Sequence, residues 1–154
     1  IMINVVHLEE GGYAMETEVE RCVDEAVEFI RNGVDVSITA SPRESSRKEF
    51  MLFTKNNGIN PDNVRYIVGE AFGKITSEIL KQVEVKGLLL TGGATSLQVC
   101  EKLGVGTARI VAEVEPGMPL VLLSNGILAV TKAGGFGTEN SLIQAAQYLR
   151  RRGC

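Results

Sequence analysis

Two glycine-rich segments have the composition and spacing of anion-binding loops. Residues 91–96 (TGGATS) follow an apolar stretch and precede a run with helical spacing. Residues 132–137 (KAGGFG) lie in the same kind of context and add a lysine. Glycine lets the backbone approach a ligand closely, and a helix that follows presents free amides and a positive dipole end to an anion. Both segments are therefore candidates for binding phosphate.

Each segment also has a simpler interpretation. Residues 91–96 equally fit a tight strand–helix turn in which a threonine or serine caps the helix. In residues 132–137, three glycines within four positions carry a large entropic cost, which favours a phosphate site over a turn. Lys132 would add a positive charge there, unless it is a surface lysine at the end of a strand. Phe136 is expected to pack under the loop, not to stack on a base.

Other kinds of active site have little support. The sequence contains neither the G-x-x-x-x-G-K-S/T pattern nor the G-x-G-x-x-G pattern. His7 is the only histidine, and the three cysteines (Cys22, Cys100 and Cys154) lie far apart. A zinc site needs about four such ligands at close spacing, so no metal-binding residue is assigned. No serine or cysteine stands in a nucleophile motif, so the catalytic residues stay unassigned.

The hydrophobic pattern predicts alternating strands and helices. Apolar and β-branched runs predict strands at residues 2–8, 34–40, 86–91, 107–114, 118–124 and 127–132. Helical spacing predicts helices at residues 15–32 and 60–83, one that ends at Gly104, and one at residues 138–151. Asn60 and Pro61 are the expected start of the second helix, and Thr138 is the expected cap of the last. A short helix and a loop are expected within residues 43–59.

This alternation predicts an α/β fold, with a layered, Rossmann-like mixed sheet that is mostly parallel and has helices on both faces. The apolar strand 86–91 is expected to be buried on both faces. Asn125-Gly126 predicts an antiparallel hairpin between residues 118–124 and 127–132. Ligands of such sheets bind beyond the carboxyl ends of the strands, which is where both glycine-rich segments lie.

Bulk composition excludes several classes of partner. Hydrophobic residues make up 44% of the chain and charged residues 23%, and the formal net charge is −3. This balance gives no basic surface for nucleic acid or an anionic membrane. The longest apolar run is far shorter than the roughly 20 residues that span a bilayer. Widely spaced cysteines in an odd number favour a reducing, cytoplasmic setting.

Three motifs in the second half occur in a distinctive order: residues 87–95 (GLLLTGGAT), 113–119 (EVEPGMP) and 130–137 (VTKAGGFG). Together they resemble the C-terminal nucleotide-binding domain of the four-carbon acid sugar kinases, over about residues 85–150. The first half is similar only in its general pattern. The resemblance implies a kinase that uses ATP and Mg²⁺ to phosphorylate a hydroxyl of a sugar acid such as threonate, erythronate or an oxo-tetronate.

The resemblance also implies which residues hold ATP. In that family an N-terminal domain binds the sugar acid, and ATP lies in the cleft between the domains. We therefore expect residues 1–154 to be a single nucleotide-binding domain from a two-domain kinase, with little activity alone and with an exposed face that favours a homodimer. The nucleotide-binding residues carried over are Gly92, Gly93, Ala94, Thr95, Gly117, Lys132, Gly134, Gly135 and Gly137.

Two departures from the family pattern keep alternatives open. Ala94 stands where the family usually has an acidic residue that would help to hold Mg²⁺, and the opening Gly-Ser turn of the family domain has no counterpart here. One alternative is a non-catalytic nucleotide-sensing or assembly module. Another is a small enzyme on a different Rossmann-like scaffold, whose glycine loops bind a sugar phosphate or a coenzyme.

Overall fold

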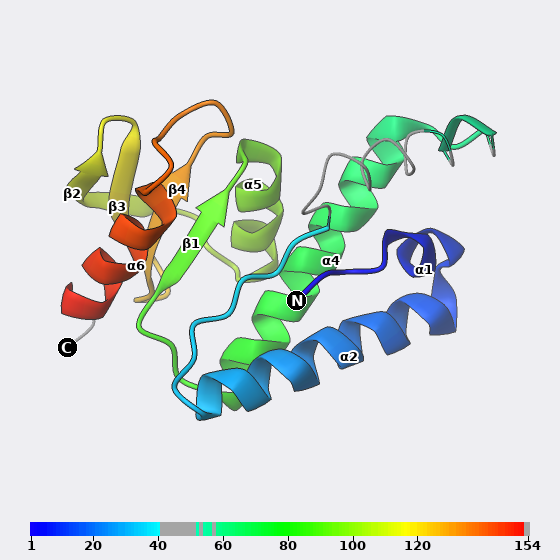
Figure 1. Cartoon of the computed structure of the whole chain (residues 1–154), viewed down its shortest axis with the longest axis horizontal. Helices are drawn as coiled ribbons and strands as arrows, with labels where there is room; N and C mark the ends of the chain where they lie inside the picture. The colour runs from blue at the N-terminus through cyan, green and yellow to red at the C-terminus, as the bar shows by residue number, and fades with distance from the viewer. Residues whose placement is uncertain (41–51, 53, 57, 153–154) are drawn as a thin grey trace. The chain divides into compact units, whose positions relative to one another are not determined.

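The chain forms two compact units. The computed structural model describes residues 1–40, 52, 54–56 and 58–152 (Figure 1). The units are Ile1–Val83 and Glu84–Cys154, and each has its own hydrophobic core. The assignment of the whole chain to one nucleotide-binding domain stays a prediction.

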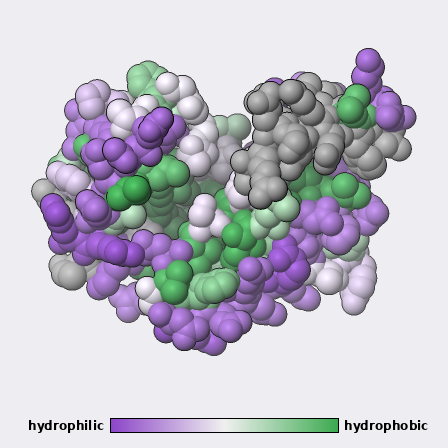
Figure 2. All heavy atoms as spheres, in the orientation of Figure 1, coloured by the Kyte–Doolittle hydropathy of each residue, from purple (hydrophilic) through white to green (hydrophobic). Residues whose placement is uncertain are grey.

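The first unit consists of helices around one core. The helices α1 (Val5–Glu10), α2 (Gly12–Arg31) and α4 (Pro61–Gln82) pack against one another. Hydrophilic side chains follow α2 along its outward side, as Figure 2 shows in purple. The buried residues of this core are Ile3, Leu8, Val19, Cys22, Val23, Ala26, Val27, Ala71, Ile75 and Ile79. The two long helices predicted at residues 15–32 and 60–83 are therefore confirmed.

The ends of the long helices follow the local sequence. The Asn60 side chain accepts a hydrogen bond from the Asp62 amide at 2.9 Å, and Pro61 occupies the first turn of α4. Proline is favourable there because it has no backbone N–H, and an N–H at that position would have no acceptor within the helix. Gly33 follows α2 with φ of 76°, which is the left-handed conformation that ends many helices. The short helix and loop predicted within residues 43–59 fall largely outside the described residues.

The predicted strands at residues 2–8 and 34–40 are wrong. Asn4 caps α1 by accepting from the Val6 amide at 3.2 Å, so the β-branched residues that follow it are helical. The backbones of the two segments form a single parallel bridge, between Met2 and Thr39. Within residues 2–8, only Ile3 and Leu8 are buried. The capping side chain thus outweighs the preference of the β-branched residues for a strand.

A buried carboxylate joins the N-terminal segment to α2. The side chain of Glu18 is 3% exposed, and its oxygens accept from the Asn4 amide at 2.6 Å and from Arg21 at 2.8 and 3.0 Å. Arg21 also donates to the Met2 carbonyl at 2.8 Å. Burial raises the pKa of Glu18, but the hydrogen bonds from Arg21 and Asn4 outweigh it and hold this pKa below its ordinary value.

The second unit contains a four-stranded mixed sheet with the order β1-β4-β3-β2. The strands are β1 (Leu88–Thr91), β2 (Ala108–Glu115), β3 (Met118–Leu123) and β4 (Leu128–Lys132). The pair β1–β4 is parallel, whereas β2–β3 and β3–β4 are antiparallel. Fewer of the strand pairs are parallel than predicted. Tight turns join β2 to β3 and β3 to β4, and strands joined by such turns are antiparallel.

Helices cover both faces of this sheet, so the predicted α/β class is confirmed. α6 (Ser141–Arg152) packs on one face with Met118, Leu120 and Val130, and α5 (Gly93–Lys102) contributes Cys100 to the cluster on the other face. As expected, β1 packs against apolar residues on both faces, through Leu89 on the side of α6 and Leu88 on the other side. Its burial is less complete than expected, since within β1 only Leu90 is fully buried.

The hairpin predicted at Asn125-Gly126 is confirmed in a three-residue form. The Leu123 amide donates to the Ile127 carbonyl, and the Gly126 amide donates to the Leu123 carbonyl, both at 2.9 Å. Gly126 has φ of 89°, whereas Asn125 keeps a negative φ. This is the loop in which a turn is followed by a glycine in the left-handed region.

Candidate functional site

The parallel pairing of β1 with β4 brings the two glycine-rich loops together. Thr91 is paired with Lys132 in the register of these strands, so both strands end at the same edge of the sheet. The Gly92 amide donates to the Lys132 carbonyl at 2.8 Å. The structure therefore places the predicted residues of both loops beside each other.

The first loop leaves the start of α5 without a side-chain cap. Gly92 is the residue before the helix, with φ of 89°, a conformation that favours glycine. Gly93 and Ala94 are exposed, and no atom lies within 4 Å of the place that a Cβ on Gly93 would take. The first amides of any α-helix have no intrahelical acceptor. The start of α5 thus offers free donors and a positive dipole end to an anion.

The hydroxyl groups near this loop are less available than the sequence suggests. Ser96 donates its hydroxyl to the Gly92 carbonyl at 2.9 Å, and its amide donates to the same oxygen. Ser96 therefore closes the first turn of α5. Thr95 is half-buried, and its Oγ1 lies near Gly92.

The second loop lies between β4 and α6, and all of residues 133–140 are exposed. At Gly134 and Gly135 a Cβ would have no atom within 4 Å, so packing does not require glycine at either position. Gly137 is different, since its φ is 94° and a Cβ would lie 2.6 Å from the Ser141 Oγ. The fold thus explains Gly137, and it leaves Gly134 and Gly135 free to present their backbone to a ligand.

Lys132 is folded onto its own loop. Its Nζ donates to the carbonyl of Ala133 at 3.2 Å and lies 3.5 Å from the carbonyl of Gly134. Its stem passes 3.0 Å from the place of a Cβ on Gly137. The ammonium group therefore supports the loop and lies beside the backbone that was predicted to bind phosphate.

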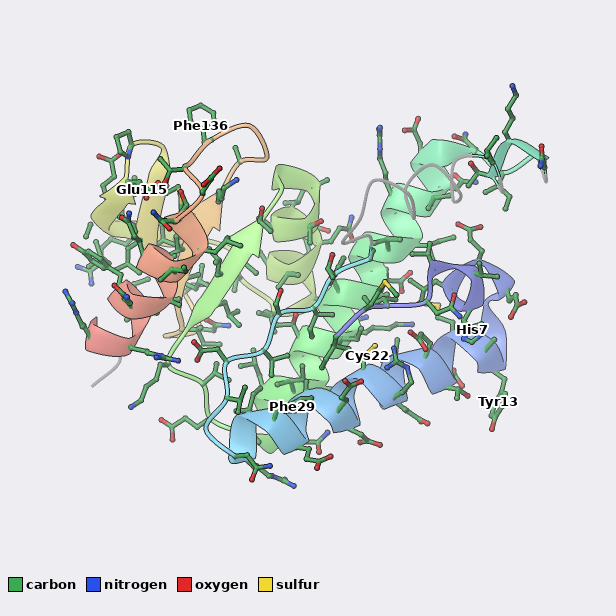
Figure 3. All side chains as sticks on the ribbon, in the orientation of Figure 1. His7, Tyr13, Cys22, Phe29, Glu115 and Phe136 are labelled. Carbon is green, nitrogen blue, oxygen red and sulfur yellow. The ribbon has the colours of Figure 1, made fainter. Side chains whose placement is uncertain are left out.

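Glu115 braces the start of α6, which the sequence did not indicate. Its carboxylate accepts from the Ser141 hydroxyl at 2.5 Å and lies 3.4 Å from the Thr138 Oγ1 (Figure 3). The Ser141 Oγ in turn accepts from the Thr138 amide at 2.6 Å. The prediction that Thr138 caps a helix starting at residue 138 is wrong. The helix starts at Ser141, whose fully buried hydroxyl joins the segment before the helix to the Glu115 carboxylate.

The turn between β2 and β3 also contacts the second loop. Gly117 has φ of 78°, and a Cβ there would lie 2.7 Å from an edge carbon of the Phe136 ring. Its amide donates to Glu113 at 3.1 Å. Gly117 therefore belongs to the same cluster as the two loops. The expectation that Phe136 packs under the loop is wrong, since it is 57% exposed and projects outward (Figure 3).

Two hollows of the surface lie away from the glycine loops. One of about 590 Å³ is lined by Thr107, Arg109 and Ser124 among others, which lie near the β3–β4 turn, away from the glycine loops. Another, of about 290 Å³, lies between α2 and α4. Most residues of the two glycine loops are exposed. Among the described residues, no three His, Cys, Asp or Glu side chains are grouped to hold a metal, and no helix could cross a membrane.

Comparison with known proteins identifies related chains. A family model described as a nucleotide-binding C-terminal domain matches residues 1–142. D-threonate kinase of Salmonella typhimurium is 27% identical over 143 residues, which is 90% of this chain and 34% of that protein. A 3-oxo-tetronate kinase of Pseudomonas savastanoi is 27% identical over 132 residues, which is 82% of this chain and 29% of that protein.

A solved structure from Bordetella bronchiseptica, described as a domain of unknown function with bound citrate in a domain-swapped dimer, is 25% identical. It matches with a TM-score of 0.67 and covers 99% of this chain and 35% of that one. The chain thus spans about a third of the length of the relatives that it matches.

Proposed function

This chain belongs to the family of nucleotide-binding C-terminal domains of four-carbon acid sugar kinases, and we propose that its two glycine loops bind ATP for phosphoryl transfer to such an acid. The kinase names of the relatives support the reaction class. We place the binding site of the sugar acid in the part of the relatives that this chain does not match. The D-threonate and 3-oxo-tetronate kinases support a four-carbon acid as the acceptor.

One observation carries the proposal: the uncapped start of α5 and the open Gly134-Gly135 backbone lie at the same edge of the sheet. The amides after Gly92 would receive phosphate oxygens, with the helix dipole adding to the attraction. Lys132 would turn from the carbonyls of its own loop towards the same phosphates. Phosphoryl transfer depends chiefly on such positioning and charge stabilisation.

A divalent ion fits the charges at this edge. Glu113 and Glu115 lie at the β2–β3 turn, and Lys132 is the opposing charge among the residues of this cluster. ATP would bring further negative charge to the edge, so Mg²⁺ bound to its phosphates is the expected partner. Ala94 supplies no ligand, and the ion would depend on phosphates and water in this chain.

The test is calorimetric titration of the 154-residue chain with ATP, with and without Mg²⁺. Gly135→Asp adds a negative charge to the proposed phosphate site and should abolish detectable binding. Gly106→Asp is the matched control, because Gly106 also has open space at its Cβ and lies before β2, outside the cluster. Equal binding by the parent chain and Gly135→Asp would refute the site.

A non-catalytic nucleotide-sensing or assembly module is the second candidate, and Ala94 is the observation that favours it. This candidate retains ATP binding and lacks phosphorylation of threonate or 3-oxo-tetronate in the full-length protein. The Bordetella structure, described as a domain-swapped dimer, supports a homodimer as part of either candidate. Sedimentation of the chain with and without ATP would measure that assembly.

A further inference from the structure

Phe136 is an exposed aromatic residue in the second glycine loop of the candidate site. Its exposed fraction is 57%, although it directly follows the Gly134-Gly135 backbone. Figure 3 shows the ring projecting outward from the loop between β4 and α6. A large apolar ring in contact with water loses the stabilisation that burial would give it. The position therefore suits a residue whose ring is covered by a ligand.

The turn at Gly117 holds one side of this ring in place. A Cβ on Gly117 would lie 2.7, 3.1 and 3.4 Å from three adjacent carbons of the ring, Cδ1, Cε1 and Cγ. Only a glycine admits the ring so close, and its φ of 78° independently favours glycine. Because the contact fixes one side of the ring, the rest of the ring is already oriented before a ligand arrives. A rigid aromatic group of this kind loses little conformational entropy on binding.

We propose that Phe136 is the residue on which the base of the bound nucleotide stacks, an inference that rests on the proposed function. If Gly134 and Gly135 contact the phosphates, the following residue lies within reach of the remainder of the same ligand. Stacking on an aromatic side chain needs no hydrogen-bond readout and is tolerant of the base. Phe136 thus sets affinity for a nucleotide over a bare polyphosphate, and it favours purines through their larger ring area.

The test compares ATP with inorganic tripolyphosphate, both with Mg²⁺, by calorimetry on the 154-residue chain. Phe136→Leu keeps an apolar side chain and removes the aromatic face, so it should weaken ATP binding about tenfold or more. Its affinity for tripolyphosphate should stay within about twofold of the parent value, since the proposed phosphate contacts come from backbone amides and Lys132 and not from the ring of residue 136. Phe136→Tyr should restore ATP binding. Phe29→Leu is the control, because Phe29 is 43% exposed on α2 and lies outside the candidate site.

Each other outcome overturns the inference in a distinguishable way. Equal weakening of ATP and tripolyphosphate by Phe136→Leu would mean that the ring only shapes the loop. Unchanged ATP binding in Phe136→Leu would mean that the base lies elsewhere. If the parent chain binds tripolyphosphate as tightly as ATP, the base adds nothing to the affinity. The proposed phosphate site would then remain, without a role for Phe136. If the parent binds neither compound, the proposed function fails and this inference fails with it.

Discussion

Replacing Ser141 by alanine removes a single oxygen atom, but it should lower the free energy of unfolding of the second unit considerably. The Ser141 side chain is fully buried, donates to Glu115 at 2.5 Å and accepts from the Thr138 amide at 2.6 Å. The substitution removes a hydrogen bond to a charged group and leaves the Thr138 amide without this acceptor. Hydrogen bonds to charged groups contribute about 1.5–3 kcal/mol, so we expect a loss of about 2 kcal/mol in the free energy of unfolding.

The assay is urea unfolding followed by circular dichroism, because the chain contains no tryptophan. A double-mutant cycle with Ser141→Ala, Glu115→Ala and the combined variant isolates the contact between the two side chains. The coupling free energy should be about 1 kcal/mol, as is usual for two side chains that form a hydrogen bond with each other. Ser96→Ala is the matched control. Its hydroxyl donates to a neutral carbonyl within its own helical turn, so the loss there should stay below about 1 kcal/mol.

Additive effects in the cycle would refute the reasoning. If the coupling free energy is within about 0.3 kcal/mol of zero, the carboxylate and the hydroxyl do not interact in solution. The β2–β3 turn would then not brace the start of α6 or the second glycine loop.

Two further predictions concern the rest of the fold. Gly87→Ala should destabilise the second unit by about 1–3 kcal/mol in urea unfolding. The new Cβ would lie 2.7 Å from the Leu128 carbonyl oxygen and would strain the β1–β4 pairing. A change below the error of the measurement would contradict that pairing. The pKa of Glu18 is lowered in the folded state, so its contribution to stability is complete above its ordinary pKa and is lost as the pH falls through the lowered value. Glu18→Gln should therefore flatten the acid side of the stability–pH curve, and an unchanged slope between about pH 5 and pH 3 would contradict the contact with Arg21.

The sequence predicted the elements of the second unit well because their signals are local. The apolar run before Gly92, the Asn125-Gly126 turn and the helix after Gly93 each depend on neighbouring residues, and each is confirmed. Local signals also predicted that two glycine loops follow strands. Their contact with each other required the β1–β4 register, which no short motif encodes.

The errors came from partners distant in the sequence. A single capping side chain, Asn4, made a helix of residues that are favourable for a strand. The start of α6 was predicted too early, and the contact of its first residue, Ser141, with Glu115, 26 residues away, left no signal in the local sequence. Phe136 was expected to be buried because large aromatic residues usually are, and only the structure shows its exposed ring beside Gly117. The roles of the site residues in binding ATP stay predictions.

The two helix starts at the site are not equivalent, and this difference leads to a last prediction. The start of α6 already has the Glu115 carboxylate near its first turn, whereas the start of α5 has a glycine cap and no side-chain partner. A phosphate should therefore be attracted more strongly to α5. Gly93→Asp places a carboxylate at that end in a position where a Cβ meets no atom within 4 Å.

An acidic residue in the first turn stabilises a helix by about 0.3–1 kcal/mol, so Gly93→Asp should unfold at the same or a higher urea concentration than the parent chain. It should nevertheless lose binding of both ATP and tripolyphosphate, because the carboxylate takes the place of the phosphate and repels it. Gly93→Asn, which has nearly the same shape without the charge, should retain more affinity. A stable Gly93→Asp variant that binds tripolyphosphate like the parent would move the phosphates away from α5, since neither misfolding nor lack of space would then explain the result.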